Sequence, residues 1–322
     1  MYRRKWNGKL GKPLHFIGSC FHKVIPQFMI QGGDITNFDG TGGESVYGPC
    51  FEDENFTLKH KFEGQLSLAN TGKPNSNNSQ FFITLAPCPH LDGQNVVFGC
   101  VRHGFGVTRE VSMVETEDDK PLVKCTITNS GQLSPEDDWG VIEHDGSQDT
   151  YPAFPEDWKL SPESVQLDEM RDVIQAMKSS GNDYFKNNQL HNAQRKYKKA
   201  LRYIQWYNGS QSFLQQKHFS GSFTATLLNL AAVQLKFREY KNAVHLCDEV
   251  LSLEPNNVKA LFRRGRAQVS RSNYEFGLQD FEQALKLLPN DPQILREIVG
   301  VKKRIQQHLD VEKITYARMF RA

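Results

Sequence analysis

Two different rhythms of apolar and polar residues divide the chain. Before about residue 133, short runs rich in β-branched and aromatic residues alternate with turns that contain Gly, Asn and Asp. Such runs at 65–70, 80–85, 96–101 and 123–128 are predicted to be strands. Short strands separated by turns are typical of an antiparallel barrel or sandwich.

From about residue 170 the apolar residues recur at helical spacing, and the pattern itself repeats. Related residues lie 34 positions apart: Ala243 and Gly277, Cys247 and Phe281, Pro255 and Pro289. This period is that of the tetratricopeptide helix pair, in which small residues let two helices approach and aromatic residues fill the gap. The spacing predicts repeats at about 174–207, 224–257 and 258–291, enough for a stable stack.

A further helix is predicted from about residue 292. Its apolar residues fall near one stripe, and Lys302, Lys303 and Arg304 lie on the opposite side. This pattern fits a helix that caps the last repeat. It also fits a calmodulin-type or membrane-surface helix, so both interpretations stay open.

The charge of the chain is distributed unevenly. The 322 residues carry a net charge of +2, but residues 1–133 are neutral, residues 134–169 carry −10 and residues 170–322 carry +12. We interpret 134–169 as an extended linker whose isolated aromatic residues dock on neighbouring structure. The basic half predicts an acidic partner, for which nucleic acid, a membrane surface and an acidic peptide all qualify. Alternatively, the acidic segment neutralises the basic half within the molecule.

Composition excludes several classes of protein. An aromatic content of 11% is too high for a chain that is disordered throughout. The longest apolar stretch, Ala225 to Leu235, is too short to span a bilayer, so a soluble protein is expected. The six cysteines are scattered without a CxxC pair, which predicts free thiols in a cytoplasmic or nuclear protein and no metal site.

The first helix of each predicted repeat carries polar residues that would face one groove. The set consists of Lys178, Asn182, Asn229, Lys259 and Arg263. First helices of stacked repeats line the concave surface, and residues four apart share a helix face, so these side chains should converge. Two cations, one with a bidentate fork, suit closely spaced carboxylates.

This constellation resembles the two-carboxylate clamp of tetratricopeptide co-chaperones. The resemblance implies that the partner is the C-terminal Glu-Glu-Val-Asp tail of the 90-kilodalton heat-shock chaperone. Nucleic acid is disfavoured because no stacking aromatic residues are interleaved with these charges.

A run of motifs in the first half carries a second resemblance. FHKVIPQFMIQGGD at 21–34 is followed by GTGGESVYG at 40–48, FEDENF at 51–56, SQFFI at 79–83 and LDGQNVVFG at 91–99. In order and spacing these segments resemble cyclophilins. With the acidic linker and the repeats, the chain is similar to the two-domain, forty-kilodalton type of that family, which isomerises Xaa-Pro bonds and partners chaperones.

The resemblance implies an α+β protein of two domains. An antiparallel cyclophilin-type β-barrel at 1–133 would be followed by the acidic linker at 134–169 and an all-α tetratricopeptide solenoid at 170–322. Family members have two further strands and a helix before the matching segment. The barrel is therefore expected to be incomplete and to expose strand edges.

The resemblance also implies the site residues. The catalytic set would be Lys23, Phe28 and Gln31, and the substrate-binding set Met29, Ala69, Asn70, Gln80, Phe82, His90, Leu91 and Asn95. No cofactor or metal is implied. Lys23 stands where the family has arginine and Asn95 where it has histidine; lysine lacks the planar fork, so weakened turnover is expected. His90 replaces the tryptophan of single-domain members, which implies reduced cyclosporin affinity.

Two functions follow from these patterns. In one, the protein isomerises Xaa-Pro bonds in proline-containing client proteins and docks on the chaperone tail. In the other, it is a catalytically weak or inactive adaptor whose barrel only binds clients. The intact clamp and the altered catalytic set favour the adaptor at the level of residues, whereas the family implies both roles together.

Overall fold

The computed structural model describes residues 11, 13–134, 145–158, 160–210 and 219–319. Contacts divide the chain into two units, one of residues 1–142 and 152–157 and the other of residues 143–151 and 158–322. Parts of the predicted first domain (1–10 and 12) and of the predicted linker (135–144 and 159) lie outside the described residues.

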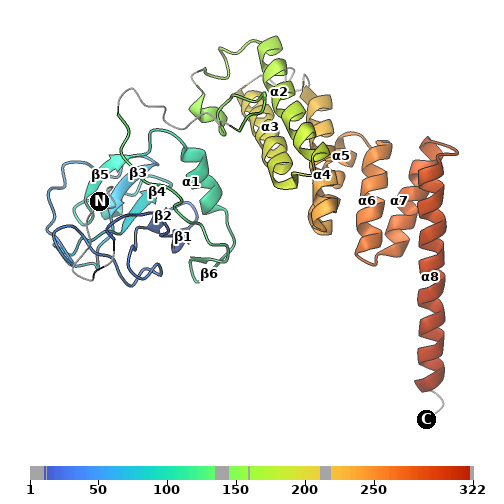
Figure 1. The fold of residues 1–322 in the computed structure, drawn as a ribbon, viewed down its shortest axis with the longest axis horizontal. Coiled ribbons are helices and arrows are strands. Elements are labelled where there is room, and N and C mark those ends of the chain that lie inside the picture. The colour runs from blue at the N-terminus through green and yellow to red at the C-terminus, as the bar shows by residue number, and fades with distance from the viewer. Residues whose placement is uncertain (1–10, 12, 135–144, 159, 211–218, 320–322) are drawn as a thin grey trace. The chain divides into compact units, whose positions relative to one another are not determined.

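The first unit contains a five-stranded antiparallel sheet in the order β1-β2-β4-β3-β5 (Figure 1). Its strands are β1 (Lys23–Ile25), β2 (Met29–Gly32), β3 (Gln65–Leu68), β4 (Phe81–Thr84) and β5 (Val97–Cys100). A short hairpin of β6 (Thr116–Glu117) and β7 (Lys120–Pro121) follows helix α1 (Phe105–Ser112). The sheet formed by the described residues is open, with β1 and β5 at its ends.

Alternation along the strands gives this sheet two different apolar faces, because successive side chains point to opposite sides. On one face Val24, Ile30 and Ile83 form a core that Phe105 of α1 helps to cover. On the other face Met29, Ala69 and Phe82 form a second buried cluster. The second cluster belongs to the candidate site.

The predicted strands at 65–70, 80–85 and 96–101 are confirmed as β3, β4 and β5 with shorter bounds. The predicted strand at 123–128 is wrong. That segment forms one isolated bridge, between Cys20 and Thr126, with backbone hydrogen bonds that link residues 18–21 to 125–127. These few backbone hydrogen bonds join the segment to one neighbour only, so no regular strand pairing forms. The sequence analysis missed β1, β2 and α1.

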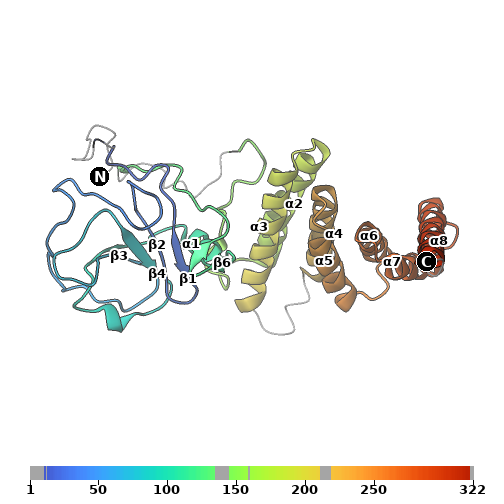
Figure 2. The ribbon, with the colours of Figure 1, turned by 90° about the horizontal axis from the view of Figure 1, so that it is seen from below.

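The second unit is helical, and its consecutive helices lie side by side (Figures 1 and 2). They are α2 (Leu167–Lys186), α3 (Leu190–Ser210), α4 (Ser220–Phe237), α5 (Tyr240–Leu253), α6 (Val258–Ser270), α7 (Tyr274–Leu287) and α8 (Pro292–Met319). Each predicted 34-residue unit thus corresponds to two helices. Among the described helices, none is long and apolar enough to cross a membrane.

Close contacts between paired helices explain the small residues of the repeat. A Cβ on Gly181 would lie 2.7 Å from the Tyr197 ring, and one on Gly265 would lie 2.8 Å from the Phe281 ring. Both rings are buried. Only glycine lets the backbone of α2 or α6 approach these rings so closely, as the repeat pattern predicts.

The acidic segment before α2 docks on α3 through buried ion pairs. Asp149 and its partners Lys196 and Lys199 all have fully buried side chains, and each lysine Nζ lies 2.7 Å from Asp149 Oδ2. Asp145 pairs with Lys196 at 2.8 Å. Within this unit the acidic residues therefore neutralise part of the basic charge. Burial of a paired charge is tolerated because each partner satisfies the other.

Aromatic residues of the predicted linker also pack locally, as expected. Trp158 contacts Tyr151, Tyr203 and Trp206 at ring-centroid distances of 5.6, 5.8 and 6.1 Å. Phe154 is buried in the first unit, where it lies directly over Gly106. Trp139 lies outside the described residues.

Candidate functional site

One row of side chains crosses the sheet of the first unit and forms the base of the candidate site. The register pairs Lys23 with Gln31, Gln31 with Phe82 and Phe82 with Ser67. Directly opposed residues of neighbouring strands point to the same face. The sheet therefore places the predicted cation, amide and aromatic ring next to one another.

An apolar cluster lies beside this row. Met29, Ala69 and Phe82 are buried there, and Ile25, Phe28 and Leu91 pack against them. His90, in the 3-10 turn Pro89–Leu91, is exposed, and its ring lies 5.3 Å from that of Phe28. Five of the predicted residues thus belong to one apolar cluster, and the exposed ring of His90 lies at its edge.

The amide of Gln31 is oriented by a chain of hydrogen bonds. Gln31 Nε2 donates to Gln80 Oε1 at 2.8 Å, and Gln80 Nε2 donates to the carbonyls of Gly40 and Gly42 at 2.9 and 2.7 Å. Because the loop carbonyls bind the Gln80 amide nitrogen, the Gln80 side-chain oxygen must face Gln31. The position of this loop therefore determines how the side-chain amide of Gln31 is oriented.

Asp34 holds that loop. Its carboxylate accepts backbone N–H groups of Thr36, Asn37, Gly40 and Gly42 at 2.9 to 3.0 Å. Burial by itself would raise the pKa of the Asp34 carboxyl, but these donors outweigh burial and hold the pKa far below its usual range. The loop is therefore built around a permanent buried anion, a feature that sequence reasoning missed.

Lys23 has an acidic neighbour that sequence reasoning also missed. Its Nζ lies 3.8 Å from Asp119 Oδ2, and the two side chains are 43% and 48% exposed. Asp119 belongs to the turn between β6 and β7, and its carbonyl accepts the N–H of Val24 at 2.8 Å. No local sequence pattern connects positions 23 and 119.

The two asparagines of the predicted set support the site through backbone contacts. Asn95 Nδ2 donates to the Leu68 carbonyl at 2.9 Å, and Asn70 Nδ2 donates to the Gln94 carbonyl at 2.8 Å. Both therefore tie the segment after Leu91 to the end of β3.

His60 is a further buried group, in contact with this apolar cluster. Its ring stacks on Phe82 at 6.0 Å, Nδ1 lies 2.9 Å from Asp92 Oδ1, and Nε2 lies 3.0 Å from Ser67 Oγ. Because Ser67 is completely buried, it has no access to substrate. This cluster supports the Phe82 ring from below.

The comparison with protein families agrees with this geometry. Residues 8–132 match the family model described as cyclophilin type peptidyl-prolyl cis-trans isomerase/CLD. Residues 8–132 form a cyclophilin-type domain. The match ends before the linker, so the helical unit is outside it. The chain therefore combines a cyclophilin-type domain with an all-helical C-terminal region.

The arrangement in the cyclophilin-type domain can act on a prolyl amide without a covalent step. Rotation about such a bond is opposed by about 18–20 kcal/mol because amide resonance must be broken. An apolar pocket that holds the proline ring, with a cation beside the row of Gln31, can stabilise the twisted amide more than either planar form. Among the described residues, no group of three or more His, Cys, Asp or Glu side chains is arranged to hold a metal ion.

The predicted clamp residues of the second unit lie on three helices. Lys178 and Asn182 come from α2, Asn229 from α4, and Lys259 and Arg263 from α6. Asn229 Nδ2 donates to Asn182 Oδ1 at 3.1 Å, which joins α2 to α4. The buried Tyr197 hydroxyl also donates to Asn182 Oδ1, at 2.7 Å. Burial raises the pKa of Tyr197 to about 12, so it remains a donor at physiological pH.

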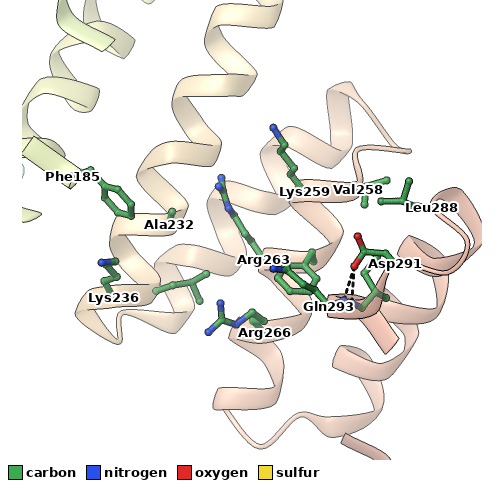
Figure 3. A pocket seen from close by; sticks show the side chains of 13 residues that line it. Phe185, Ala232, Lys236, Val258, Lys259, Arg263, Arg266, Leu288, Asp291 and Gln293 are labelled. Carbon is green, nitrogen blue, oxygen red and sulfur yellow. Dashed lines mark hydrogen bonds between the residues drawn. The ribbon is translucent and has the colours of Figure 1, made fainter. Parts of the chain in front are cut away.

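Two of these residues, Lys259 and Arg263, line a pocket of about 610 Å³ between α2, α4, α6 and the start of α8. Figure 3 shows that Lys259 and Arg263 share it with Lys236 and Arg266. The pocket lining also includes apolar side chains, among them Phe185. Sequence reasoning missed Lys236, Arg266 and Phe185, although Lys236 is seven residues after Asn229, two turns along α4, and could have been found by helical spacing.

Arg263 is half-buried, and no carboxylate of the described residues forms an ion pair with it. In the part of the chain that the structure describes, its Nη1 is a buried atom without a hydrogen-bond partner. Burial lowers the pKa of Arg263 and also lowers that of Lys178. A desolvated cation without an anion is costly, so the pocket is electrostatically suited to an anionic ligand.

Proposed function

We propose that the protein is a peptidyl-prolyl cis-trans isomerase that assists protein folding and docks, through its helical unit, on the acidic C-terminal tail of the 90-kilodalton heat-shock chaperone. The cyclophilin-type domain supplies the isomerase, and its clients are proteins with accessible Xaa-Pro bonds. The helical unit supplies the docking groove, which we assign to tetratricopeptide repeats. We place the protein in the cytoplasm, and also in the nucleus.

One observation carries the docking part of this proposal. The buried Nη1 of Arg263 has no partner among the described residues, and it belongs to a pocket that holds three further cations. A terminal carboxylate offers the two acceptor oxygens that an arginine fork binds best. A peptide that ends in Glu-Glu-Val-Asp brings several carboxylates to the same groove.

The tetratricopeptide assignment is supported by equivalent contacts at equal spacing. The pairs Gly181 with Tyr197 and Gly265 with Phe281 are each 16 residues apart, and Ala231 and Cys247 occupy the same two positions in the middle pair. Ala231 and Cys247 are completely buried. A small residue at the same buried position of the first helix, 16 residues before a buried residue of the second, thus supports all three proposed units.

The docking proposal is tested by the binding of a Met-Glu-Glu-Val-Asp peptide to the full chain, measured by calorimetry. Lys259→Ala and Arg263→Ala should each weaken binding by at least about tenfold, as expected when one partner of a buried charged contact is removed. Lys198→Ala, which removes an exposed charge of α3, should leave binding unchanged. Amidation of the peptide C-terminus removes the terminal carboxylate and should weaken binding as much as the loss of Lys259 or Arg263 does.

A stability measurement separates the role of Arg263 from a structural one. If Arg263 serves to bind an anionic ligand and does not stabilise the fold, Arg263→Met should abolish peptide binding. The ligand-free variant should then be at least as stable as the parent protein. Undiminished peptide affinity in the Lys259 and Arg263 variants would contradict the clamp. Displacement of the peptide by single-stranded DNA would favour nucleic acid as the partner.

A second candidate function is the adaptor with weak or no catalysis. It is favoured by the ion pair of Lys23 with Asp119 and by the contact that turns Asn95 toward the Leu68 carbonyl. The isomerisation rate of an Xaa-Pro peptide with the full chain decides between the two. A rate equal to the uncatalysed one would leave only the adaptor.

Helix α8 suggests one more partner for this proposed function. Lys302, Lys303 and Arg304 are on its exposed surface near Val299, which is 69% exposed. Ile294, Ile298 and Val301 are buried against the preceding helices, so α8 also caps the array. A calmodulin-type protein that binds basic amphipathic helices could take the exposed part of α8.

A further inference from the structure

Asp119 occupies the tip of a two-residue hairpin beside the candidate catalytic cation. The turn between β6 and β7 consists of Asp118 and Asp119, whose φ angles are 49° and 62°. Two successive residues with positive φ define the tight turn that fits a twisted hairpin, and the second position usually holds glycine. An aspartate there puts a carboxylate where the turn would otherwise carry no side chain.

The hairpin is attached to the strand that carries Lys23. The N–H of Val24 donates to the Asp119 carbonyl at 2.8 Å, so the position of Asp119 follows that of β1. The carboxylate Oδ2 lies 3.8 Å from Lys23 Nζ, and both side chains are about half exposed. Lys23 lies opposite Gln31 in the ladder that forms the site.

We propose that Asp119 is a positioning residue that restrains the isomerase by competing with the substrate for the ammonium of Lys23. This inference rests on the proposed isomerase function. A lysine has one compact charge on a flexible stem, so an ammonium drawn toward Asp119 is less available to the twisted amide. An arginine could bind both groups through different nitrogens.

The strength of the ion pair predicts the size of the effect. Exposed pairs contribute little, and their loss corresponds to about a two- to fivefold change in an equilibrium or rate. Asp119→Asn, which suits a positive φ as well as aspartate does, should therefore raise kcat/KM by about two- to fivefold. The increase should appear mainly in kcat, because the cation acts on the twisted state rather than on the bound planar peptide.

Ionic strength distinguishes this role from a structural one. At about 0.5 M salt the screening length is comparable to the separation of the two charges, so salt should speed the parent and leave little difference from Asp119→Asn. The substrate is an uncharged Xaa-Pro peptide with blocked ends, and the enzyme is the full chain. Asp118→Asn removes the same charge from the same turn, and Asp118 makes no ion pair in the part of the chain described, so it is the matched control.

Three outcomes overturn the inference. They are an Asp119→Asn variant no faster than the parent at low salt, an equal gain in Asp118→Asn, and a gain that persists unchanged at high salt. If the parent protein shows no isomerase activity, the proposed isomerase function is wrong, and the inference about Asp119 fails with it. Because parent and variants are measured in one assay, these failures are distinguishable.

Discussion

At the scale of the residue, the cyclophilin-type domain combines an apolar cluster with a cation beside an acid. Phe28, Met29 and Phe82, which the resemblance implies as site residues, pack in one cluster. Lys23 presents a single ammonium that also faces Asp119. The proposed isomerase and adaptor functions are therefore best distinguished by substitutions of the polar residues at this position.

Lys23→Arg should increase the isomerisation rate. The planar fork can hold a carbonyl and still direct a donor toward the prolyl nitrogen, a gain on the order of tenfold, comparable to one charge-assisted hydrogen bond. The rate of an Xaa-Pro peptide, measured with the full chain, checks this. Lys23→Ala should lower the rate below that of the parent, and equal rates for all three proteins would show that position 23 takes no part in catalysis.

At the scale of the element, buried polar groups fix the loop beside the site. The segment from Asp34 to Gly43 has few apolar residues, and its backbone donors converge on the Asp34 carboxylate instead of a ladder. The same segment carries the carbonyls that hold Gln80. A charge inside the loop thus determines the position of an amide in the site.

Asp34→Asn should destabilise the protein in a pH-dependent way. The folded-state pKa of Asp34 lies below the ordinary aspartate value of 3.8, so its carboxylate stabilises the fold above about pH 4, and this contribution is lost as the pH falls. Near pH 7 the variant should lose about 1.5–3 kcal/mol, and the two proteins should converge in acid. Urea unfolding at several pH values measures the difference.

Asp39→Asn is the control for that experiment, because the Asp39 side chain is exposed and its carboxylate accepts hydrogen bonds from the N–H and hydroxyl of Thr41 in its own turn. It should change stability by a few tenths of a kcal/mol at most, as surface substitutions usually do. A difference between Asp34→Asn and the parent that stays constant from neutral to acid pH would show that the charge of Asp34 is unimportant.

At the scale of the whole molecule, an open apolar face and a basic groove are the main exposed features. In the first unit a pocket of about 380 Å³ is lined by Phe16, Phe81, Phe98 and other uncharged residues. Phe98 lies on the end strand β5 and is 47% exposed. An end strand with apolar side chains tends to pair with another chain unless charges protect it.

Phe98→Lys should reduce self-association of the full chain. A lysine on β5 places a charge at the edge and removes apolar surface, the protection found on natural edge strands. Sedimentation velocity over a range of protein concentrations measures the effect. Leu58→Lys, the same kind of change at a site that is 56% exposed and outside the sheet, should have little effect; an equal reduction would mean that total charge, not the edge, controls association.

The sequence by itself determined features that local periodicity encodes. The strands at 65–70, 80–85 and 96–101 and the helices of the second unit follow from residue spacing, because neighbouring side chains must share a face. Motif order predicted the cyclophilin-type domain, and helical spacing placed the five residues of the proposed clamp on α2, α4 and α6. The failure at 123–128 shows the limit, since a strand forms only where partners exist on the sheet.

Only the tertiary structure decided which distant groups meet. The contacts of Lys23 with Asp119, of Asp149 with Lys196 and Lys199, and of Arg263 with a pocket shared by Lys236 and Arg266 join segments that are far apart in the chain. A charge has no periodic signature, and its role depends on burial and on the nearest opposite charge. Those depend on how the elements pack, which is why the Lys23–Asp119 pair and the buried Nη1 of Arg263, which has no hydrogen-bond partner among the described residues, appear only in three dimensions.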